Sequence, residues 1–148
     1  MKEMQENDQI TREVNKVNVE FYRAFESLSI EIMDKLWMHD ENVVCIHPGW
    51  DLFTGWLAVR ESWITIFSNT EVIRFVITNT KVRALDNKAA VVVCVENIET
   101  TSTDGRIIRI GVIATNVFER NEQLNQWLLV HHHGSPVTNY MPPNVSSQ

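Results

Sequence analysis

Cysteine, proline and glycine are all scarce in this sequence. Two cysteines, four prolines and five glycines occur among its 148 residues. Cys45 and Cys94 both lie in apolar segments typical of strands, where a free thiol behaves as a small hydrophobic side chain. A disulfide between them is an alternative, but a protein in a reducing compartment does not need one. The sequence also contains no internal repeat and no low-complexity segment.

Basic runs and long apolar runs are missing as well. Thirteen Lys and Arg stand against nineteen Asp and Glu, and no basic cluster could neutralise a phosphate backbone, so we expect no nucleic-acid partner. No segment approaches the roughly 18 apolar residues that cross a bilayer, and the polar first residues contain no apolar signal core. We therefore expect a cytoplasmic protein that does not associate with membranes.

What remains is the composition of one ordinary globular domain. Hydrophobic residues make up 44% of the chain and charged residues 22%, which argues against global disorder. A chain of this length can bury a core of its own. We expect a flexible N-terminal segment over residues 1–10, a domain over residues 11–135 and an irregular C-terminal tail over residues 136–148.

The hydrophobic periodicity changes from helical to strand-like along the chain. Spacings of three and four predict helices, and β-branched runs bounded by turn residues predict strands. The expected helices cover 11–26, 30–38 and 56–67, and the expected strands cover 43–46, 72–85, 89–101, 106–120 and 126–133. Helices followed by long strands indicate an α+β fold, with a curved antiparallel sheet wrapped around the N-terminal helices as a cone. The open end of such a cone is a natural small-molecule site.

The corner after the first strand contains the most distinctive candidate residue. His47 follows an apolar strand, and Pro48 and Gly49 end that strand because proline lacks a backbone donor and glycine accepts positive φ. The loop over residues 51–55 then leads to a helix. Its inner stripe is Trp56, Val59, Trp63 and Phe67. A titratable ring among tryptophans suggests a lined cavity, and the alternative is a surface histidine beside a packed turn.

Several short segments, in this order, resemble one family. LWMHDENVVCIHPGW, GWLAVRESW, VVVCVENIE, ATNVFER and QWLLVHHHGSP are similar to the SnoaL-like branch of the nuclear transport factor 2 (NTF2-like) superfamily. The likeness covers residues 14–136. It implies a cone-shaped α+β fold and a homodimer formed through the outer face of the sheet. It does not determine function, because members include isomerases, dehydratases, hydrolases, cyclases and noncatalytic assembly domains.

Ketosteroid isomerase is a more distant resemblance, and it supplies roles for three positions. Its catalytic base precedes a proline at the end of the first strand, where this chain has His47. Its tyrosine falls near Tyr22, and its hydrogen-bond-donating aspartate, a case that the field uses to illustrate carboxyl pKa tuning, falls on Asn116. Of these three positions, only Tyr22 keeps the residue type of the isomerase.

Strand parity extends the candidate site. If Trp127 faces the interior of the cone, period-two alternation places His131 and His133 on the same face of their strand. We expect Glu96, from another strand, to face the same pocket. A carboxylate next to a histidine suits general acid/base work near neutral pH. The candidate catalytic residues are His47, Glu96, Asn116, His131 and Tyr22, and the candidate ligand-binding residues are Trp50, Trp56, Trp63, Cys94 and His133.

The same polar residues also fit a purely structural role. They could form a buried network in which every polar group is hydrogen-bonded, or the three consecutive histidines could lie at a hydrated dimer interface. A metal held by His131, His133 and His47 is a weaker alternative, since no carboxylate-rich or paired-cysteine spacing supports it, and we expect neither metal nor cofactor. We expect a homodimer that binds a small apolar or aromatic molecule, with isomerisation, dehydration or hydrolysis as candidate chemistry. The alternative is a noncatalytic dimerisation and assembly module.

Overall fold

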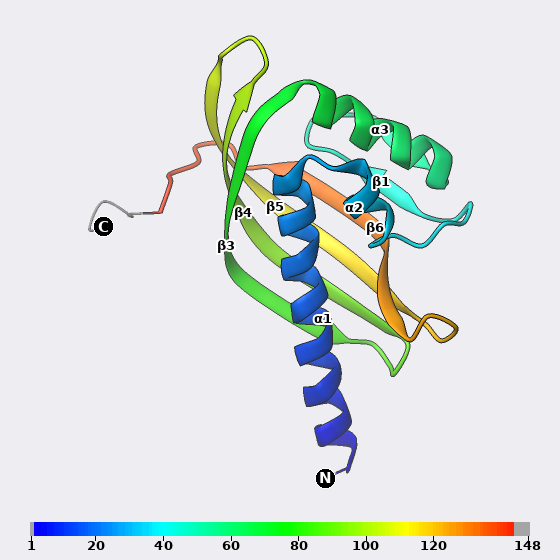
Figure 1. The fold of residues 1–148 in the computed structure, drawn as a ribbon. Coiled ribbons are helices and arrows are strands. Elements are labelled where there is room, and N and C mark those ends of the chain that lie inside the picture. Colours follow the sequence, from blue (N-terminus) through cyan, green and yellow to red (C-terminus); the bar gives the residue numbers. More distant parts are fainter. Residues whose placement is uncertain (1, 144–148) are drawn as a thin grey trace.

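A computed structural model describes residues 2–143 of the chain. Three helices lie on one side of a six-stranded sheet, which confirms the expected α+β class (Figure 1). The helices are α1 (Lys2–Ser27), α2 (Ile30–Asp34) and α3 (Trp56–Ser68). The strands are β1 (Val44–Ile46), β2 (Leu52–Thr54), β3 (Thr70–Ala84), β4 (Ala89–Ser102), β5 (Ile107–Asn121) and β6 (Gln126–Pro136).

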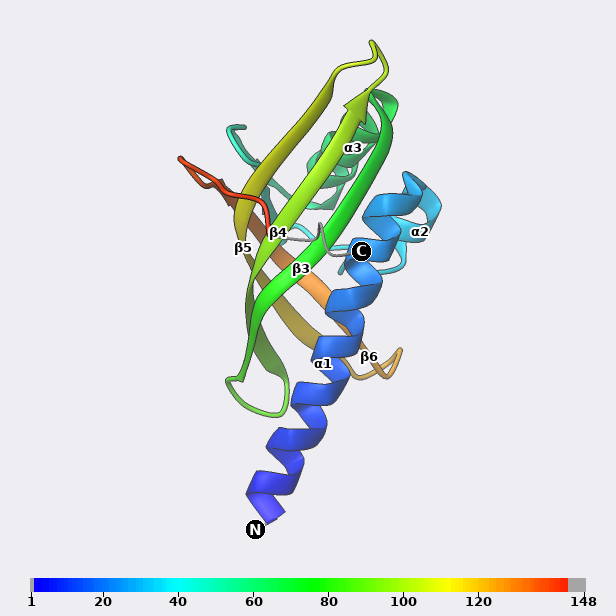
Figure 2. The same cartoon turned by 90° about the vertical axis from the view of Figure 1, so that its left-hand side faces the viewer.

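Helix α1 is longer than its apolar stripe predicts. Its buried positions begin at Ile10, whereas residues 2–9 are exposed and project beyond the sheet (Figures 1 and 2). Apolar periodicity marks only the part of a helix that is buried, so it placed the start at residue 11 and assigned these residues to a separate segment. None of the helices within residues 2–143 is both long enough and apolar enough to cross a bilayer.

The segment after α2 leaves the helix earlier than predicted. Ser29 caps α2 by accepting a hydrogen bond from the backbone N of Ile32 at 3.3 Å. The helix ends at Asp34, and the prediction that it continues to residue 38 was wrong. Residues 36–38 instead bond to the edge of β6, where Met38 N donates to Leu129 O at 2.9 Å and Leu129 N donates to Leu36 O at 2.8 Å.

The sheet is mixed, with strand order β2-β1-β6-β5-β4-β3. Strands β3 to β6 form a long antiparallel meander that curves around the helices (Figure 2). Strand β1 pairs antiparallel with β2 but parallel with β6. The β1–β6 pair is therefore the one departure from the expected antiparallel sheet. Strand β2 lies within residues 51–55, which the sequence assigned to a loop. Its three residues are too few to show an alternating pattern.

A β-bulge interrupts the alternation of side chains in β6. Val117 pairs with His131 and Phe118 pairs with Leu129, so Val130 is an extra residue between two consecutive pairs. Side chains before and after a bulge no longer share the face that simple alternation assigns them. Trp127 and Leu129 face the interior before the bulge, and His132 faces it afterwards.

The core is built largely from aromatic rings. Trp63 of α3 contacts Phe21 and Phe25 of α1, with ring centroids 5.8 and 4.8 Å apart. Edge-to-face geometry of this kind adds about 0.5–1.5 kcal/mol beyond the burial of apolar area. This cluster joins α1 and α3 above the concave face of the sheet, and it surrounds the polar side chains that follow.

The chain after β6 returns to the outer face of the sheet. Residues 137–143 contain neither helix nor strand, and residues 144–148 of the predicted irregular tail lie outside the described part of the chain. Val137 N donates to Gly111 O at 2.8 Å, and the Tyr140 hydroxyl donates to Asn97 Oδ1 at 2.7 Å. The Tyr140 ring occupies the space that a Cβ at Gly111 would need.

Gly111→Ala should therefore displace the Tyr140 ring. We expect a loss of about 1–3 kcal/mol in the free energy of unfolding, the usual cost of forcing extra atoms into a packed site, measured by urea denaturation. In a Tyr140→Ala background the three ring atoms that lie closest to the added Cβ are removed, so the same substitution should cost less. Equal costs in both backgrounds would show that the ring does not rest on Gly111.

Candidate functional site

Six buried side chains from four elements form a polar cluster inside the fold. Helix α1 places Asn18 and Tyr22 on one face because they are four residues apart. Strand β4 places Cys94 and Glu96 inward, two residues apart, and β5 and β6 contribute one residue each. We call this set the buried polar network, and its members are Asn18, Tyr22, Cys94, Glu96, Asn116 and His132.

Hydrogen bonds connect the network from the carboxyl to the imidazole. The Tyr22 hydroxyl donates to Glu96 Oε2 at 2.5 Å. Asn116 Nδ2 lies 2.9 Å from Asn18 Oδ1 and 3.2 Å from the Tyr22 hydroxyl, and it donates to both. Asn116 Oδ1 faces His132 Nδ1 at 2.5 Å. A carboxyl, a phenol, an amide and an imidazole are thus connected across the interior.

Burial changes the protonation of the network. The pKa of Glu96 is raised to about 7 because its charged form is removed from water, and the hydrogen bond from Tyr22 only partly opposes this. Burial and the neighbouring Glu96 raise the pKa of Tyr22 well above its usual value. Burial also holds the pKa of His132 well below its usual range. Near neutral pH, Glu96 is therefore present in both its protonated and its ionised form, while Tyr22 and His132 stay neutral.

His47 stands at the end of β1, beside the network. The turn that follows is closed by Trp50 N, which donates to His47 O at 2.9 Å, and Gly49 takes φ +79°. The His47 ring is buried, edge-on to Trp63 with centroids 4.6 Å apart, and its Nε2 lies 2.8 Å from Ser62 Oγ. Burial lowers its pKa to about 4, so the ring is neutral at physiological pH. Its centroid is 6.4 Å from that of His132.

The structure corrects the predicted faces of the histidine run. His131 is partly exposed and His133 is exposed, so neither lies beside Glu96 as strand parity predicted. The bulge at Val130 shifts the alternation by one residue, and His132 takes the interior position instead. Glu96, Asn116 and Tyr22 converge inside the fold, as expected. The described residues contain no group of three or more His, Cys, Asp or Glu that could hold a metal ion.

The predicted ligand-binding residues separate into interior and peripheral ones. Trp63 and Cys94 are buried beside the polar residues. Trp50 is 41% exposed but still contacts His47, with ring centroids 5.2 Å apart. Trp56 stacks on His39 at 4.6 Å, on the surface beyond Trp37. Cys45 and Cys94 are both free thiols, and burial raises the pKa of each.

Sequence reasoning missed three polar residues of the interior. Asn18 lies one helical turn before Tyr22 on the buried face of α1, and this spacing was a usable signal. Ser62 lies three residues after Val59 on the buried stripe of α3 and contacts His47, so its spacing was a usable signal too. His132 was assigned to the wrong face because a bulge leaves no clear mark in a strand sequence.

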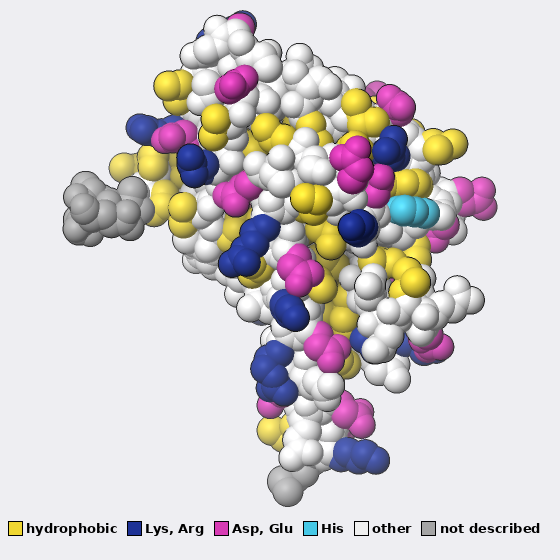
Figure 3. Space-filling model, in the orientation of Figure 1, with side chains coloured by type: hydrophobic (Ala, Val, Ile, Leu, Met, Phe, Trp, Pro, Cys, Tyr) yellow, Lys and Arg dark blue, Asp and Glu magenta, His cyan; other side chains and the backbone are white. Residues whose placement is uncertain are grey.

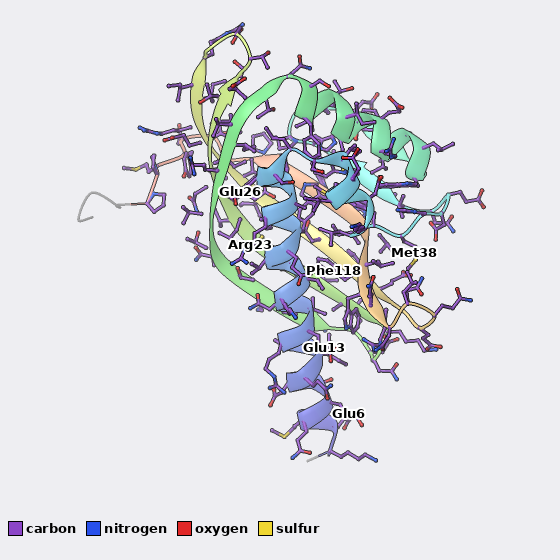
Figure 4. All side chains as sticks on the ribbon, in the orientation of Figure 1. Glu6, Glu13, Arg23, Glu26, Met38 and Phe118 are labelled. Atoms are coloured by element: carbon purple, nitrogen blue, oxygen red, sulfur yellow. The ribbon has the colours of Figure 1, made fainter. Side chains whose placement is uncertain are left out.

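A groove of about 810 Å³ opens beside this interior, between α1, the segment after α2 and the β5–β6 hairpin. Hydrophobic side chains are visible in the recess beside α1 in Figure 3. Glu13 on α1 and Met38 on the opposite wall are labelled in Figure 4. Glu13 accepts hydrogen bonds from Trp127 Nε1 at 2.9 Å and from Arg120 at 3.5 Å. None of the network residues lines this groove.

The raised pKa of Glu96 predicts a pH dependence of stability. A carboxyl whose pKa is higher in the folded state binds more protons there, so its contribution is fully present below about pH 4.5 and is lost as the pH rises through about 7. From pH 5 to pH 8 the wild type should lose about 2–3 kcal/mol of unfolding free energy relative to Glu96→Gln, measured by urea denaturation at both values.

Glu99→Gln is the matched control, because Glu99 lies on the same strand but pairs with Arg109 on the surface. The unfolding free energy of Glu99→Gln should change between pH 5 and pH 8 by the same amount as that of the wild type. The pH dependence of His47 is common to all three proteins and cancels in the comparison. A Glu96→Gln profile parallel to that of the wild type would contradict the raised pKa.

Comparisons with known proteins agree with this architecture. A family model described as a SnoaL-like domain matches residues 14–139. F-box protein SKIP8 of Arabidopsis thaliana is 31% identical over 125 residues, which cover 84% of this chain and 50% of that protein. The chain therefore spans about half the length of the curated relative that it matches.

Solved structures show the same fold. A proposed dehydratase of the NTF2-like family from Streptomyces avermitilis has a TM-score of 0.80 at 32% identity, covering 88% of this chain and 98% of that one. A proposed calcium/calmodulin-dependent protein kinase type II association domain from Thiobacillus denitrificans has a TM-score of 0.69 at 28% identity, covering 82% and 93%. A ketosteroid isomerase-like protein from Erwinia carotovora atroseptica, with a TM-score of 0.74 at 13% identity over 86% and 95%, shares the fold. The chain belongs to the SnoaL-like family of the NTF2-like superfamily.

Proposed function

We propose that the protein binds a small, neutral and largely apolar molecule and transforms it by acid/base chemistry. The observation that carries the proposal is the buried hydrogen bond between Tyr22 and Glu96, with the Glu96 pKa raised to about 7. Perturbed carboxyl groups with a specific hydrogen-bond partner are concentrated at functional sites. A carboxyl that serves only to stabilise the fold gains nothing from a pKa near the operating pH.

Each group has a chemical role in this proposal. Glu96, when protonated, is the donor that stabilises a developing oxyanion, and Tyr22, which donates its one proton to Glu96 Oε2, holds that carboxyl in place. His47 is neutral and unprotonated at that pH, as a general base must be. Isomerisation and dehydration next to a carbonyl group both begin by removing a proton from carbon, and that step is the one we assign to His47.

The surroundings of His47 favour neutral, flat ligands. Trp63, Trp50 and Phe53 contact the imidazole, with centroids 4.6, 5.2 and 6.1 Å away. Aromatic walls with few polar groups select apolar rings. The interior network contains no Lys or Arg that would pair with an anionic substrate. The similarity to a proposed dehydratase, which covers almost all of that chain, supports chemistry of this class.

Hydrogen exchange at carbon tests the proposal without a known substrate. Incubation in D₂O with a panel of neutral aromatic and alicyclic ketones should give deuterium incorporation next to the carbonyl, measured by mass spectrometry. His47→Gln should lower the exchange rate about 10²- to 10⁴-fold, the usual contribution of a positioned base. Glu96→Gln should also slow exchange, because the amide is a weaker donor to the oxyanion.

Glu99→Gln is again the control and should exchange at the wild-type rate. Circular dichroism of each variant separates lost chemistry from lost folding. Wild-type protein that gives no exchange above buffer across the panel, or variants that exchange as fast as the wild type, would remove these residues from the mechanism.

A second function, noncatalytic assembly, is favoured by the outer face of the sheet. Val76, Val93 and Ile113 are 51%, 39% and 47% exposed on adjacent strands. Isolated exposed apolar residues are normal, but several on neighbouring strands mark interaction surfaces. We infer that two copies of the chain associate through this face. The similarity to a proposed kinase association domain is consistent with such a role.

Sedimentation equilibrium at micromolar concentration should therefore show a dimer. Val93→Lys combined with Ile113→Lys should give a monomer, because buried unpaired ammonium groups are costly. Leu57→Lys is the control, since Leu57 is 82% exposed on α3, away from the outer face of the sheet, and it should remain dimeric. A monomeric wild-type protein would contradict assembly through the sheet.

A further inference from the structure

Ser62 contacts the candidate base, His47, at one of its two ring nitrogens. Its Oγ lies 2.8 Å from His47 Nε2 and 2.6 Å from the backbone O of Val59. Both Ser62 and His47 are buried, with 3% and 2% of their surface exposed. A serine hydroxyl has one proton to donate and can accept two hydrogen bonds.

The direction of each hydrogen bond follows from this inventory. The Val59 carbonyl can only accept, so at 2.6 Å the single Ser62 proton is committed to it. Toward His47, Ser62 Oγ is then an acceptor, and Nε2 must carry the proton. Because the pKa of His47 is about 4, the ring holds one proton at neutral pH and Nδ1 keeps an unshared electron pair.

We propose that Ser62 is a positioning residue that holds neutral His47 as the Nε2–H tautomer, so that Nδ1 is the atom that accepts the substrate proton. The tautomer itself is independent of any reaction, and its use in proton abstraction rests on the proposed function. Nδ1 is bonded to Cγ, the ring atom that carries Cβ, and it is the ring nitrogen that Ser62 does not contact.

The other neighbours of the ring do not supply this orientation. The Cys45 Sγ lies 3.6 Å from Nε2 and 3.9 Å from Nδ1, and a thiol is a weak partner in hydrogen bonds. The tautomer of His132 does not depend on Ser62, and it is the opposite of the His47 tautomer. The Nδ1 of His132 donates to Asn116 Oδ1, because the amide nitrogen of Asn116 is committed to Asn18 and Tyr22. The two facing imidazoles thus have opposite tautomers.

Nitrogen NMR reads the tautomer directly. In protein labelled with ¹⁵N-histidine at pH 7, the His47 signals, assigned by their loss in His47→Gln, should show a protonated Nε2 and an unprotonated Nδ1. In Ser62→Ala, the two His47 shifts should move toward each other as the second tautomer becomes populated. In Ser62→Thr, which keeps the hydroxyl, the wild-type shifts should persist.

Ser68→Ala is the matched control. Ser68 lies on the same helix and also donates to a backbone carbonyl, that of Ile64 at 2.8 Å, but it is exposed. It should leave the His47 signals unchanged. Ketone exchange in D₂O should fall at least about tenfold in Ser62→Ala, within the ~10²–10⁴ that a positioned base contributes, and not in Ser68→Ala.

The outcomes separate this inference from the proposed function. A protonated Nδ1 in the wild type, or His47 shifts that do not move in Ser62→Ala, would overturn the role of Ser62 whether or not any ketone exchanges. The predicted tautomer in a wild type that exchanges no ketone would support the orientation of His47 and count against the reaction alone.

Discussion

Most of the side-chain polar atoms that the described residues take from water have a hydrogen-bond partner inside the fold, and Trp37 Nε1 and Trp63 Nε1 are the exceptions. An unpaired buried donor or acceptor costs about 1–3 kcal/mol, a large part of the net stability of a domain. Tyr22 is the partner of Glu96, and Asn116 is the partner of Asn18, Tyr22 and His132. The helices and strands must therefore adopt the one arrangement in which these groups meet.

That arrangement couples distant parts of the chain. Asn116 of β5 bonds to α1 and β6, so a shift of β5 would break hydrogen bonds to three partners, and a shift of β6 would break the one to His132. The aromatic rings around the network exclude water and make each of these bonds stronger, but also make their loss more costly. Stability and chemistry thus depend on the same few contacts, and variants in the network must be tested for both.

The strands and much of the interior could be predicted from the sequence, because buried residues recur at regular spacings along helices and strands. The long strands were found to within a few residues, and Tyr22, Glu96 and Asn116 were correctly placed inside the fold. Features without such a regular spacing were not found. Strand β2 is too short, the exposed start of α1 has no apolar stripe, and residues 36–38 follow the edge of β6 rather than their own helical pattern. The roles of the site residues are not readable from burial at all.

The bulge at Val130 and the three histidines after it affect how β6 would tolerate a change of register. Moving the register of a strand by one residue normally exchanges its buried and exposed faces. Here positions 131, 132 and 133 are all histidine, so a slip in either direction would still present an imidazole to Asn116. Insertions or deletions of one residue near the bulge would then change which histidine is inside, but not the kind of side chain that the network receives.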